Sequence, residues 1–229
     1  GIIFPGFSFG ASGTTVGEIV FNTGMTGYQE VITDPSYFGQ ILTFTYPEIG
    51  NTGINHEDSE SSISVKGIIV RNYSSNNSNW RSEKSFNQWL IEQNIIGLFG
   101  IDTRALVKIL RSKGSMNGLI TSEDKDIKSC LKIISDTPKM EGLNLSKEVS
   151  TKKNYSWLTT SKTDFDVRKK KSNDVKKLKI VAVDFGIKQS ILNRLVSHGC
   201  EILVIPYTSS FEDILAMKPD GIFFSNGPG

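Results

Sequence analysis

Short apolar segments alternate with amphipathic ones along residues 179–225, and this alternation constrains the fold more than any other feature of the sequence. The apolar segments cover residues 179–185, 201–205 and 221–225. Continuous apolar strands separated by helices are typical of a parallel sheet that is covered on both faces. The sequence therefore predicts a βαβαβ unit, the first half of a doubly wound α/β sheet that normally has five or six strands.

Two helices are predicted between these strands. The first stops at Gly199 and gathers its apolar residues on one side, namely Ile187, Ile191, Leu192, Leu195 and Val196. The second begins at a capping box, Ser209-x-x-Glu212, and ends at Pro219. We expect the last strand to expose a long apolar edge if nothing pairs with it.

The first part of the chain shows a different arrangement of strands. Its β-branched and aromatic segments predict a mixed or antiparallel sheet with strands near 18–21, 40–45, 66–71 and 94–101. Residues 1–9 resemble the second half of a hairpin without its first strand, so we expect residues upstream of Gly1.

Helices interrupt these strands, which makes the first part a mixed α/β domain. One is predicted near 82–93, with Phe86, Trp89 and Leu90 on a single face. Another starts at Asp102 or Thr103 and stops at Gly114. Its buried stripe consists of Leu106, Val107, Ile109 and Leu110.

Apolar periodicity fades between residues 146 and 177, where Lys, Ser, Thr and Asp dominate. Such a composition indicates a linker or a long surface excursion. We therefore place a domain boundary near residue 175 and expect one domain at 1–175 and a second at 176–229. The basic run Arg168–Lys171 lies among polar residues rather than aromatic ones, which favours a solvated linker over a nucleic-acid site.

Composition argues against several classes of protein. A hydrophobic content of 38% with 22% charged residues is that of a globular chain rather than a disordered one. No apolar run approaches the roughly 20 residues of a membrane helix. Cys130 and Cys200 lie far apart, so neither a disulfide framework nor a zinc site is predicted. A net charge of +2 gives no support for nucleic-acid binding.

Asn226-Gly227-Pro228-Gly229 follows the third strand of the βαβαβ unit, where ligands of such sheets bind. Glycines leave backbone N–H groups uncovered, and these could donate to a carbonyl oxygen that becomes charged during acyl transfer. Taken alone, these four residues favour a tight turn over this role. Both interpretations stay open at this level.

Other candidate groups suggest little chemistry. His198 precedes Gly199 at a helix end, and His56 lies in a polar loop, so neither is predicted to be a catalytic base. Three nearby acids are expected to face solvent rather than to bind a metal, namely Glu57, Asp58 and Glu60. No nucleotide phosphate loop occurs, and the glycines at 6, 10, 13 and 17 favour hairpin or bulge positions over phosphate binding.

Several long segments resemble the carbamoyl-phosphate synthase small-subunit family. They lie at 17–30, 33–37, 45–51, 78–81, 100–104, 114–118, 183–188 and 225–229, and among them are Gly-Glu-Ile-Val-Phe-Asn-Thr-Gly-Met-Thr-Gly-Tyr-Gln-Glu and Ser-Asn-Gly-Pro-Gly. The resemblance covers nearly the whole chain. It implies a small-subunit domain followed by the first half of a flavodoxin-like, class I glutamine amidotransferase domain.

The resemblance also implies a function. Small subunits of this family hydrolyse L-glutamine through a cysteine thioester and deliver ammonia to a large subunit. The large subunit uses ATP, Mg and bicarbonate to make carbamoyl phosphate for arginine and pyrimidine biosynthesis, so this chain is expected to hold no cofactor. Ser36 is expected to bind the α-amino and carboxylate end of glutamine, and Gly227 and Gly229 to line the same pocket. Ser36 can also be a simple turn residue after Asp34-Pro35.

The family's Gly-x-Cys-x-Gly-His segment and later His-x-Glu do not occur in these 229 residues. We therefore expect a partial sequence, inactive alone, because removing a nucleophile costs about 10⁶-fold in turnover. Two alternatives remain: a non-catalytic scaffold docked on the large subunit, and an unrelated flavodoxin-like module that binds flavin or nucleotide. We expect the protein in the cytoplasm, or in the plastid stroma if it is plastid-encoded.

Overall fold

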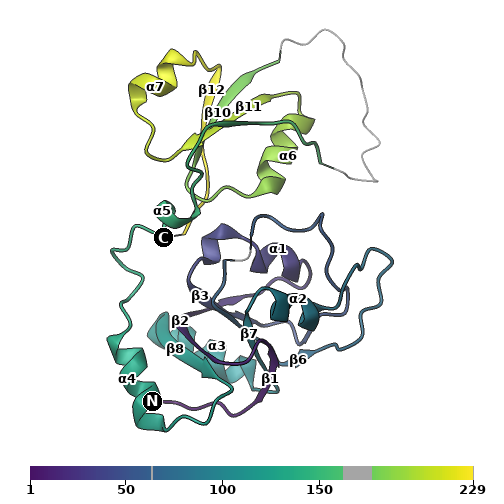
Figure 1. Ribbon diagram of the computed structural model, residues 1–229, viewed down its shortest axis with the longest axis vertical. Helices are drawn as coiled ribbons and strands as arrows, with labels where there is room; N and C mark the ends of the chain where they lie inside the picture. Colours follow the sequence, from purple (N-terminus) through teal and green to yellow (C-terminus); the bar gives the residue numbers. More distant parts are fainter. Residues whose placement is uncertain (63, 162–176, 229) are drawn as a thin grey trace. The chain divides into compact units, whose positions relative to one another are not determined.

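The computed structural model of the chain describes residues 1–62, 64–161 and 177–228, and the predicted basic run Arg168–Lys171 lies outside them. The chain forms two compact units, Gly1–Leu143 and Asn144–Gly229, each with its own sheet (Figure 1). None of the helices in the described ranges has the length and apolar character needed to cross a membrane.

The first unit contains a six-stranded sheet in the order β1-β7-β5-β3-β2-β8. Its four inner strands are parallel, and the edge strands β1 and β8 are antiparallel to their neighbours. The bounds are β1 Phe7–Gly10, β2 Thr14–Asn22, β3 Gln40–Phe44, β5 Gly67–Ile69, β7 Ile96–Phe99 and β8 Met116–Thr121. A separate two-stranded ladder pairs β4 Glu48–Ile49 with β6 Asn72–Tyr73.

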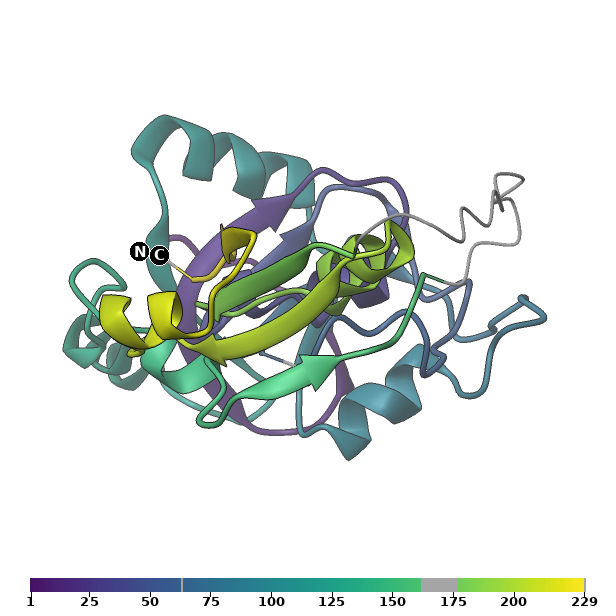
Figure 2. The same ribbon diagram turned by 90° about the horizontal axis from the view of Figure 1, so that it is seen from above.

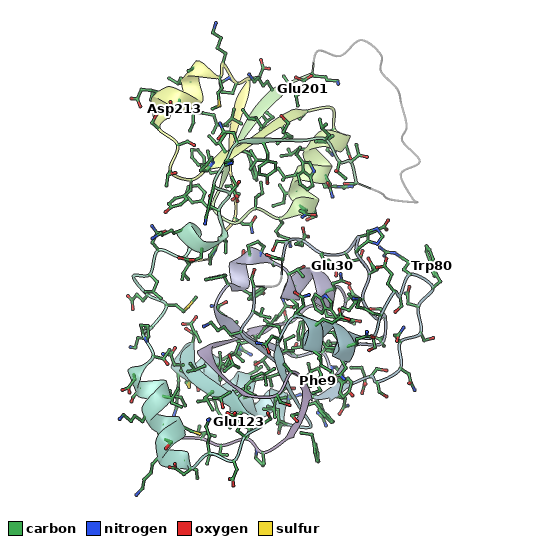
Figure 3. The ribbon with its side chains drawn as sticks, in the orientation of Figure 1. Phe9, Glu30, Trp80, Glu123, Glu201 and Asp213 are labelled. Atoms are coloured by element: carbon green, nitrogen blue, oxygen red, sulfur yellow. The ribbon has the colours of Figure 1, made fainter. Side chains whose placement is uncertain are left out.

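Helices cover both faces of this sheet because each has one apolar side. The core cluster on one face includes Ile32 of α1 and Leu90 of α2, and the cluster on the other includes Leu106 and Leu110 of α3. Phe9 lies inside the first cluster, stacked on Tyr73 (Figure 3). The helices are α1 Tyr28–Ile32, η1 Pro35–Tyr37, α2 Phe86–Glu92, α3 Thr103–Lys113 and α4 Ile127–Asp136.

The predicted helices of this unit are confirmed in position. Phe86, Trp89 and Leu90 are the buried residues of α2, as their spacing indicates. Asp102 is the N-cap of α3 and accepts a hydrogen bond from the Ala105 amide at 3.0 Å, and Gly114 follows its last residue. The sheet is mixed rather than antiparallel, since its inner strands are parallel.

The second unit is a four-stranded sheet in the order β12-β10-β11-β9. Strands β12, β10 and β11 are parallel, whereas β9 runs antiparallel along β11, as Figure 2 shows. Figure 1 shows α6 and α7 on opposite sides of the strands. The elements are α5 Ser146–Val149, β9 Tyr155–Trp157, β10 Lys179–Asp184, α6 Gln189–Ser197, β11 Glu201–Pro206, α7 Phe211–Ala216 and β12 Gly221–Phe224.

The predicted βαβαβ unit is therefore present. Leu192 of α6 packs with Ala182 and Val204, and Ile214 of α7 packs with Val181 and Ile205. Successive strand residues point to opposite faces, so each helix covers its own face of the same strands. At the edge of the sheet, β12 leaves Phe224 65% exposed, as expected for an apolar strand with one neighbour among the described residues.

Three features differ from the sequence expectations. Residues 146–161 are not a plain linker, because they contain α5 and β9, and β9 pairs with β11 in the second sheet. The described contacts accordingly separate at 143/144, upstream of the boundary expected near 175. The N-terminal strand β1 pairs with β7, which lies far along the chain, and the hairpin partner expected upstream of Gly1 lies outside these residues and stays a prediction.

The third difference concerns the start of α7. Its N-cap is Ser210, whose hydroxyl accepts from the Asp213 amide at 3.1 Å, so the predicted box Ser209-x-x-Glu212 is wrong by one residue. Ser210 Oγ also lies 2.7 Å from the Asp213 carboxylate. Both registers offer a serine and an acid three residues later, so local chemistry does not distinguish them.

Candidate functional site

The second sheet has a topological switch point between β10 and β12. From β10 the chain crosses through α6 to β11 on one side, and then through α7 to β12 on the other side of β10. The crevice beyond the carboxyl ends of two such strands is the usual ligand site of open α/β sheets. Asp184–Ile187 and Ser225–Pro228 occupy these two carboxyl ends.

Asp184 organises the loop after β10. It is only 4% exposed, and its Oδ1 accepts hydrogen bonds from the amides of Gly186 at 2.9 Å and Ile187 at 2.8 Å. Its Oδ2 accepts from the Thr151 amide at 2.7 Å. A buried carboxylate requires such donors because it has left water. Burial and the negative charge of Asp184 together raise the pKa of Tyr155, which lies nearby.

Ser225 and Phe185 connect the two loops. The Phe185 amide donates to Ser225 Oγ at 2.8 Å, and the Ser225 amide donates to the Val183 carbonyl at 3.1 Å. A Cβ on Gly227 would lie 2.1 Å from the carbonyl oxygen of Phe185. No side chain fits there, so this position requires glycine for close approach of two backbones and not for an unusual φ angle.

Gly227 thus lies where the sequence analysis expects it, at the carboxyl end of the third strand of the βαβαβ unit. It is half-buried, and Pro228 after it is buried. Gly229 lies outside the described residues. A glycine against a neighbouring loop is compatible with a tight turn and with an oxyanion-binding amide, so the role of Gly227 remains a prediction.

Ser36 belongs to the first unit and is described within it. It lies in η1, between α1 and β3, and its amide donates to Asp34 Oδ1 at 2.9 Å. This hydrogen bond makes Asp34 the N-cap of the turn, with Pro35 in the first position. Ser36 therefore occupies the turn expected from Asp34-Pro35, at the amino end of β3. Its predicted contact with glutamine remains a prediction.

A depression of the first unit lies at the carboxyl ends of β2 and β3, whereas Ser36 lies at the amino end of β3. A cavity of about 140 Å³ forms where β2 and β3 end, lined in part by Gly24, Met25, Phe44 and Tyr46. Ser36 does not line it. The sequence did not predict this cavity, because its walls come from two stretches of the chain, residues 24–28 and 44–52, that meet only in the folded protein.

A second depression of about 130 Å³ adjoins it and includes Tyr28, Glu30, Asp58 and Arg81. Burial, with the negative charges of Asp58 and Glu60, raises the pKa of Glu30 on α1 (Figure 3). Arg81 lies 2.6 Å from Asp58 and thereby neutralises part of this charge.

The acids expected to face solvent differ among themselves. Glu57 is exposed and lies 3.4 Å from Arg81, but Glu60 is only 5% exposed, so the expectation is wrong for it. The Glu60 amide donates to Thr33 Oγ1 at 2.8 Å, which holds this segment against α1. His56 is exposed and pairs with Glu83, and His198 is the C-cap of α6.

Sequence reasoning missed Asp184 and Ser225 as members of the site, although both stand in segments that carry the family resemblance. One signal was present: an Asp that ends a strand and precedes Gly by two residues is typical of a side chain that caps its own turn. The partner amide of Thr151 had no such signal, because it comes from a segment expected to be a linker.

Comparison with known families accounts for most of the chain. Residues 1–120 match the family described as carbamoyl-phosphate synthase small chain, CPSase domain. Residues 181–229 match the glutamine amidotransferase class-I family. The second match contains both loops of the switch-point site.

Individual relatives give the same result. The carbamoyl phosphate synthase small chain of Synechocystis sp. is 53% identical over 231 residues, and that of Porphyra purpurea is 48% identical over 233. The corresponding chain of Vibrio cholerae is 48% identical over 232 residues. Each alignment covers 100% of this chain and 60–61% of the relative. The chain therefore spans about 60% of the length of these relatives.

Proposed function

This chain belongs to the carbamoyl-phosphate synthase small-chain family, and from that premise we propose that it is part of a glutaminase subunit. The observation that carries the proposal is the match of residues 181–229 to class I amidotransferases at the crevice between β10 and β12. The substrate is L-glutamine, and the product used downstream is ammonia.

In the proposed reaction a cysteine thiolate adds to the side-chain amide carbon of glutamine. A C–S bond forms and the amide oxygen becomes negatively charged. The adduct expels ammonia, which takes a proton from a general acid, and water then cleaves the thioester to glutamate. The Gly227 amide donates to the oxyanion, where such donors contribute most. Ser36 binds the α-amino and carboxylate groups of the substrate.

We assign this nucleophile to neither cysteine of the chain, because neither stands in a Gly-x-Cys-x-Gly-His segment. Cys130 lies in α4, and Cys200 precedes β11, at the amino end of the second sheet. The switch-point crevice lies at the carboxyl ends of the strands. We therefore propose that residues outside this 229-residue chain supply the nucleophile and its base, and that the chain alone does not hydrolyse glutamine.

The ammonia passes to a large subunit, which consumes bicarbonate and ATP with Mg to form carbamoyl phosphate. The heterodimer is thus a glutamine-hydrolysing ligase, and its product serves arginine and pyrimidine synthesis. A polypeptide that docked without hydrolysing glutamine would be a scaffold, and a glutaminase assay distinguishes this alternative.

The test is an assay of two polypeptides for glutamate release from glutamine, with and without a large chain. One is the 229-residue chain and the other is the product of the reading frame extended past the codon for Gly229. We expect activity from the extended protein, stimulated by the large chain, and none above background from the shorter one. An extended protein that binds the large chain but releases no glutamate would support the scaffold and overturn the proposal.

A further inference from the structure

Asp184 is unusual because it is a buried acid held by backbone amides. It is 4% exposed, and its carboxylate accepts hydrogen bonds from three of them, those of Thr151, Gly186 and Ile187. Acids are almost never buried to this extent unless a structural or functional need holds them there. The three amides belong to two segments that meet at the carboxyl end of β10.

The turn that Asp184 closes contains Phe185, whose two backbone groups both face the β12 loop. Its amide donates to Ser225 Oγ at 2.8 Å, and its carbonyl oxygen lies against Gly227 so closely that a Cβ there would be 2.1 Å away. The Ser225 hydroxyl also donates to the Asn226 carbonyl at 2.6 Å. A shift of the Asp184 turn therefore moves the surface on which Gly227 rests.

From this arrangement we propose that Asp184 and Ser225 are positioning residues that fix the Gly227 amide in the glutaminase site. The inference rests on the proposed function, in which that amide donates to the oxyanion. Neither side chain needs to touch the substrate. Asp184 accepts hydrogen bonds from the turn after β10, and Ser225 accepts one from the Phe185 amide in that turn. The Phe185 carbonyl in turn packs against Gly227, so the position of Gly227 depends on both side chains.

Oxyanion stabilisation is sensitive to such positioning. A donor is effective when it lies about 2.7–3.1 Å from the oxyanion, and functional groups must be held within about 0.5 Å. Loss of one oxyanion donor costs about 10²–10³-fold in kcat. A displaced donor is expected to cost less, about 10–100-fold, because the hydrogen bond is lengthened rather than removed.

The experiment uses the complete small chain assembled with its large chain. The variants are Asp184→Asn and Ser225→Ala, with Ser225→Thr as the conservative change that keeps a hydroxyl. Asn keeps one oxygen that accepts from the amides of Gly186 and Ile187. Its NH₂ group faces the Thr151 amide and cannot accept the hydrogen bond that this amide donates to Asp184. Each protein is measured for kcat and KM and for its affinity for two probes.

The probes separate oxyanion binding from ground-state binding. The active-site thiol adds to the aldehyde carbon of glutamate γ-semialdehyde. The product is a tetrahedral adduct whose oxygen needs the oxyanion donor. Glutamate, the product, forms no such adduct. We expect Asp184→Asn and Ser225→Ala to weaken semialdehyde binding and kcat by about 10–100-fold, with glutamate affinity and KM within about threefold of wild type. Ser225→Thr should restore most of both.

Two variants of the same unit serve as matched controls at sites remote from the crevice. Asp220→Asn weakens the acceptor of the Lys179 amide, 2.9 Å away at the amino ends of β10 and β12. Ser210→Ala removes the acceptor of the Asp213 amide at the start of α7. Both are expected to lower the melting temperature and to leave the ratio of semialdehyde to glutamate affinity unchanged.

The inference is overturned if Asp184→Asn and Ser225→Ala lower the melting temperature like the controls but keep the wild-type ratio of the two affinities. Equal losses for both probes would also overturn it, since they indicate general collapse of the pocket. If Asp184→Asn does not fold, the comparison of Ser225→Ala with Ser225→Thr tests the inference by the same ratio of affinities. A wild-type complex without glutaminase activity would instead refute the proposed function itself.

Discussion

The carbonyl oxygen of Phe185 lies 2.1 Å from the point that a Cβ on Gly227 would occupy. Contacts this short do not occur between unbonded carbon and oxygen atoms, so the loops after β10 and β12 can approach only because residue 227 has no side chain. The conformation of Gly227 is compatible with other residues, since its φ angle is not in the left-handed region. Residues other than glycine are therefore excluded at position 227 only by the lack of room for a Cβ.

We expect Gly227→Ala to separate the two loops and to destabilise the second unit by about 1–3 kcal/mol, the usual cost of overpacking. Under the proposed function, kcat of the complete enzyme should fall at least about tenfold, because the amide of residue 227 moves with the loop. Gly221→Ala, at the amino end of the same strand, is the control: its Cβ would meet only the flexible end of Ile180 at 3.0 Å. Urea unfolding and glutaminase assays distinguish the two.

The assignment of β9 to the second unit predicts the effect of removing Trp157. Its indole N–H donates to Asn193 Oδ1 at 2.8 Å, and the residue pairs with Ile202 of β11. Trp157→Ala should cost about 2 kcal/mol and speed hydrogen exchange at amides of β11 but not of β3. Trp80→Ala is the matched control, because Trp80 is 87% exposed (Figure 3). Faster exchange in β3 rather than β11 would contradict the assignment.

The N-cap of α7 can be located by paired substitutions. Ser210→Ala removes a side-chain acceptor for the Asp213 amide and should cost about 1 kcal/mol of unfolding free energy. Ser209→Ala should change stability by less than about 0.5 kcal/mol. Thermal unfolding of the two variants measures the difference, and a larger loss for Ser209→Ala would show that the helix begins one residue earlier.

The raised pKa of Glu30 predicts a pH-dependent stability. Burial is its main cause, so ionised Glu30 destabilises the first unit at pH values above its folded-state pKa. Below the unfolded-state pKa the acid is neutral in both states and the penalty vanishes. Glu30→Gln should therefore unfold at higher urea than wild type at about pH 8, with a difference that shrinks as the pH falls toward about 4.

Glu92→Gln is a control that is expected to change the urea midpoint in the opposite direction. A hydrogen bond from Lys84 lowers the pKa of Glu92, so its ionised form stabilises the fold above its usual titration range. Its substitution is expected to lower the urea midpoint slightly at about pH 8 and to have less effect at acid pH. A pH-independent effect of Glu30→Gln would show that packing, and not charge, is responsible.

Local patterns in the sequence were sufficient to place most elements. The spacing of Phe86, Trp89 and Leu90 predicts α2, and Asp102 with Gly114 brackets α3. Each of these signals is complete within a few residues, because helix caps and amphipathic faces depend on near neighbours in the chain. The alternation over 179–225 likewise specified three parallel strands and two covering helices.

Local patterns failed where two positions offer the same chemistry or where a partner is distant. Ser209 and Ser210 are each followed by an acid at the third position, and only the path of the backbone selects Ser210. The short strand β9 has no periodicity of its own. It becomes a strand because β11 offers it an edge with unpaired amides and carbonyls.

Patterns along the chain were enough to predict the fold class of both units, the family and the position of Gly227 at the end of β12. Three features became visible only in the folded chain: Asp184 is buried, its carboxylate joins Thr151 to the turn after β10, and Phe185 lies against Gly227. These features escaped prediction because the residues involved are far apart along the chain. Thr151 is 33 residues from Asp184, and Ser225 is 40 from Phe185, so these contacts exist only after the strands have paired.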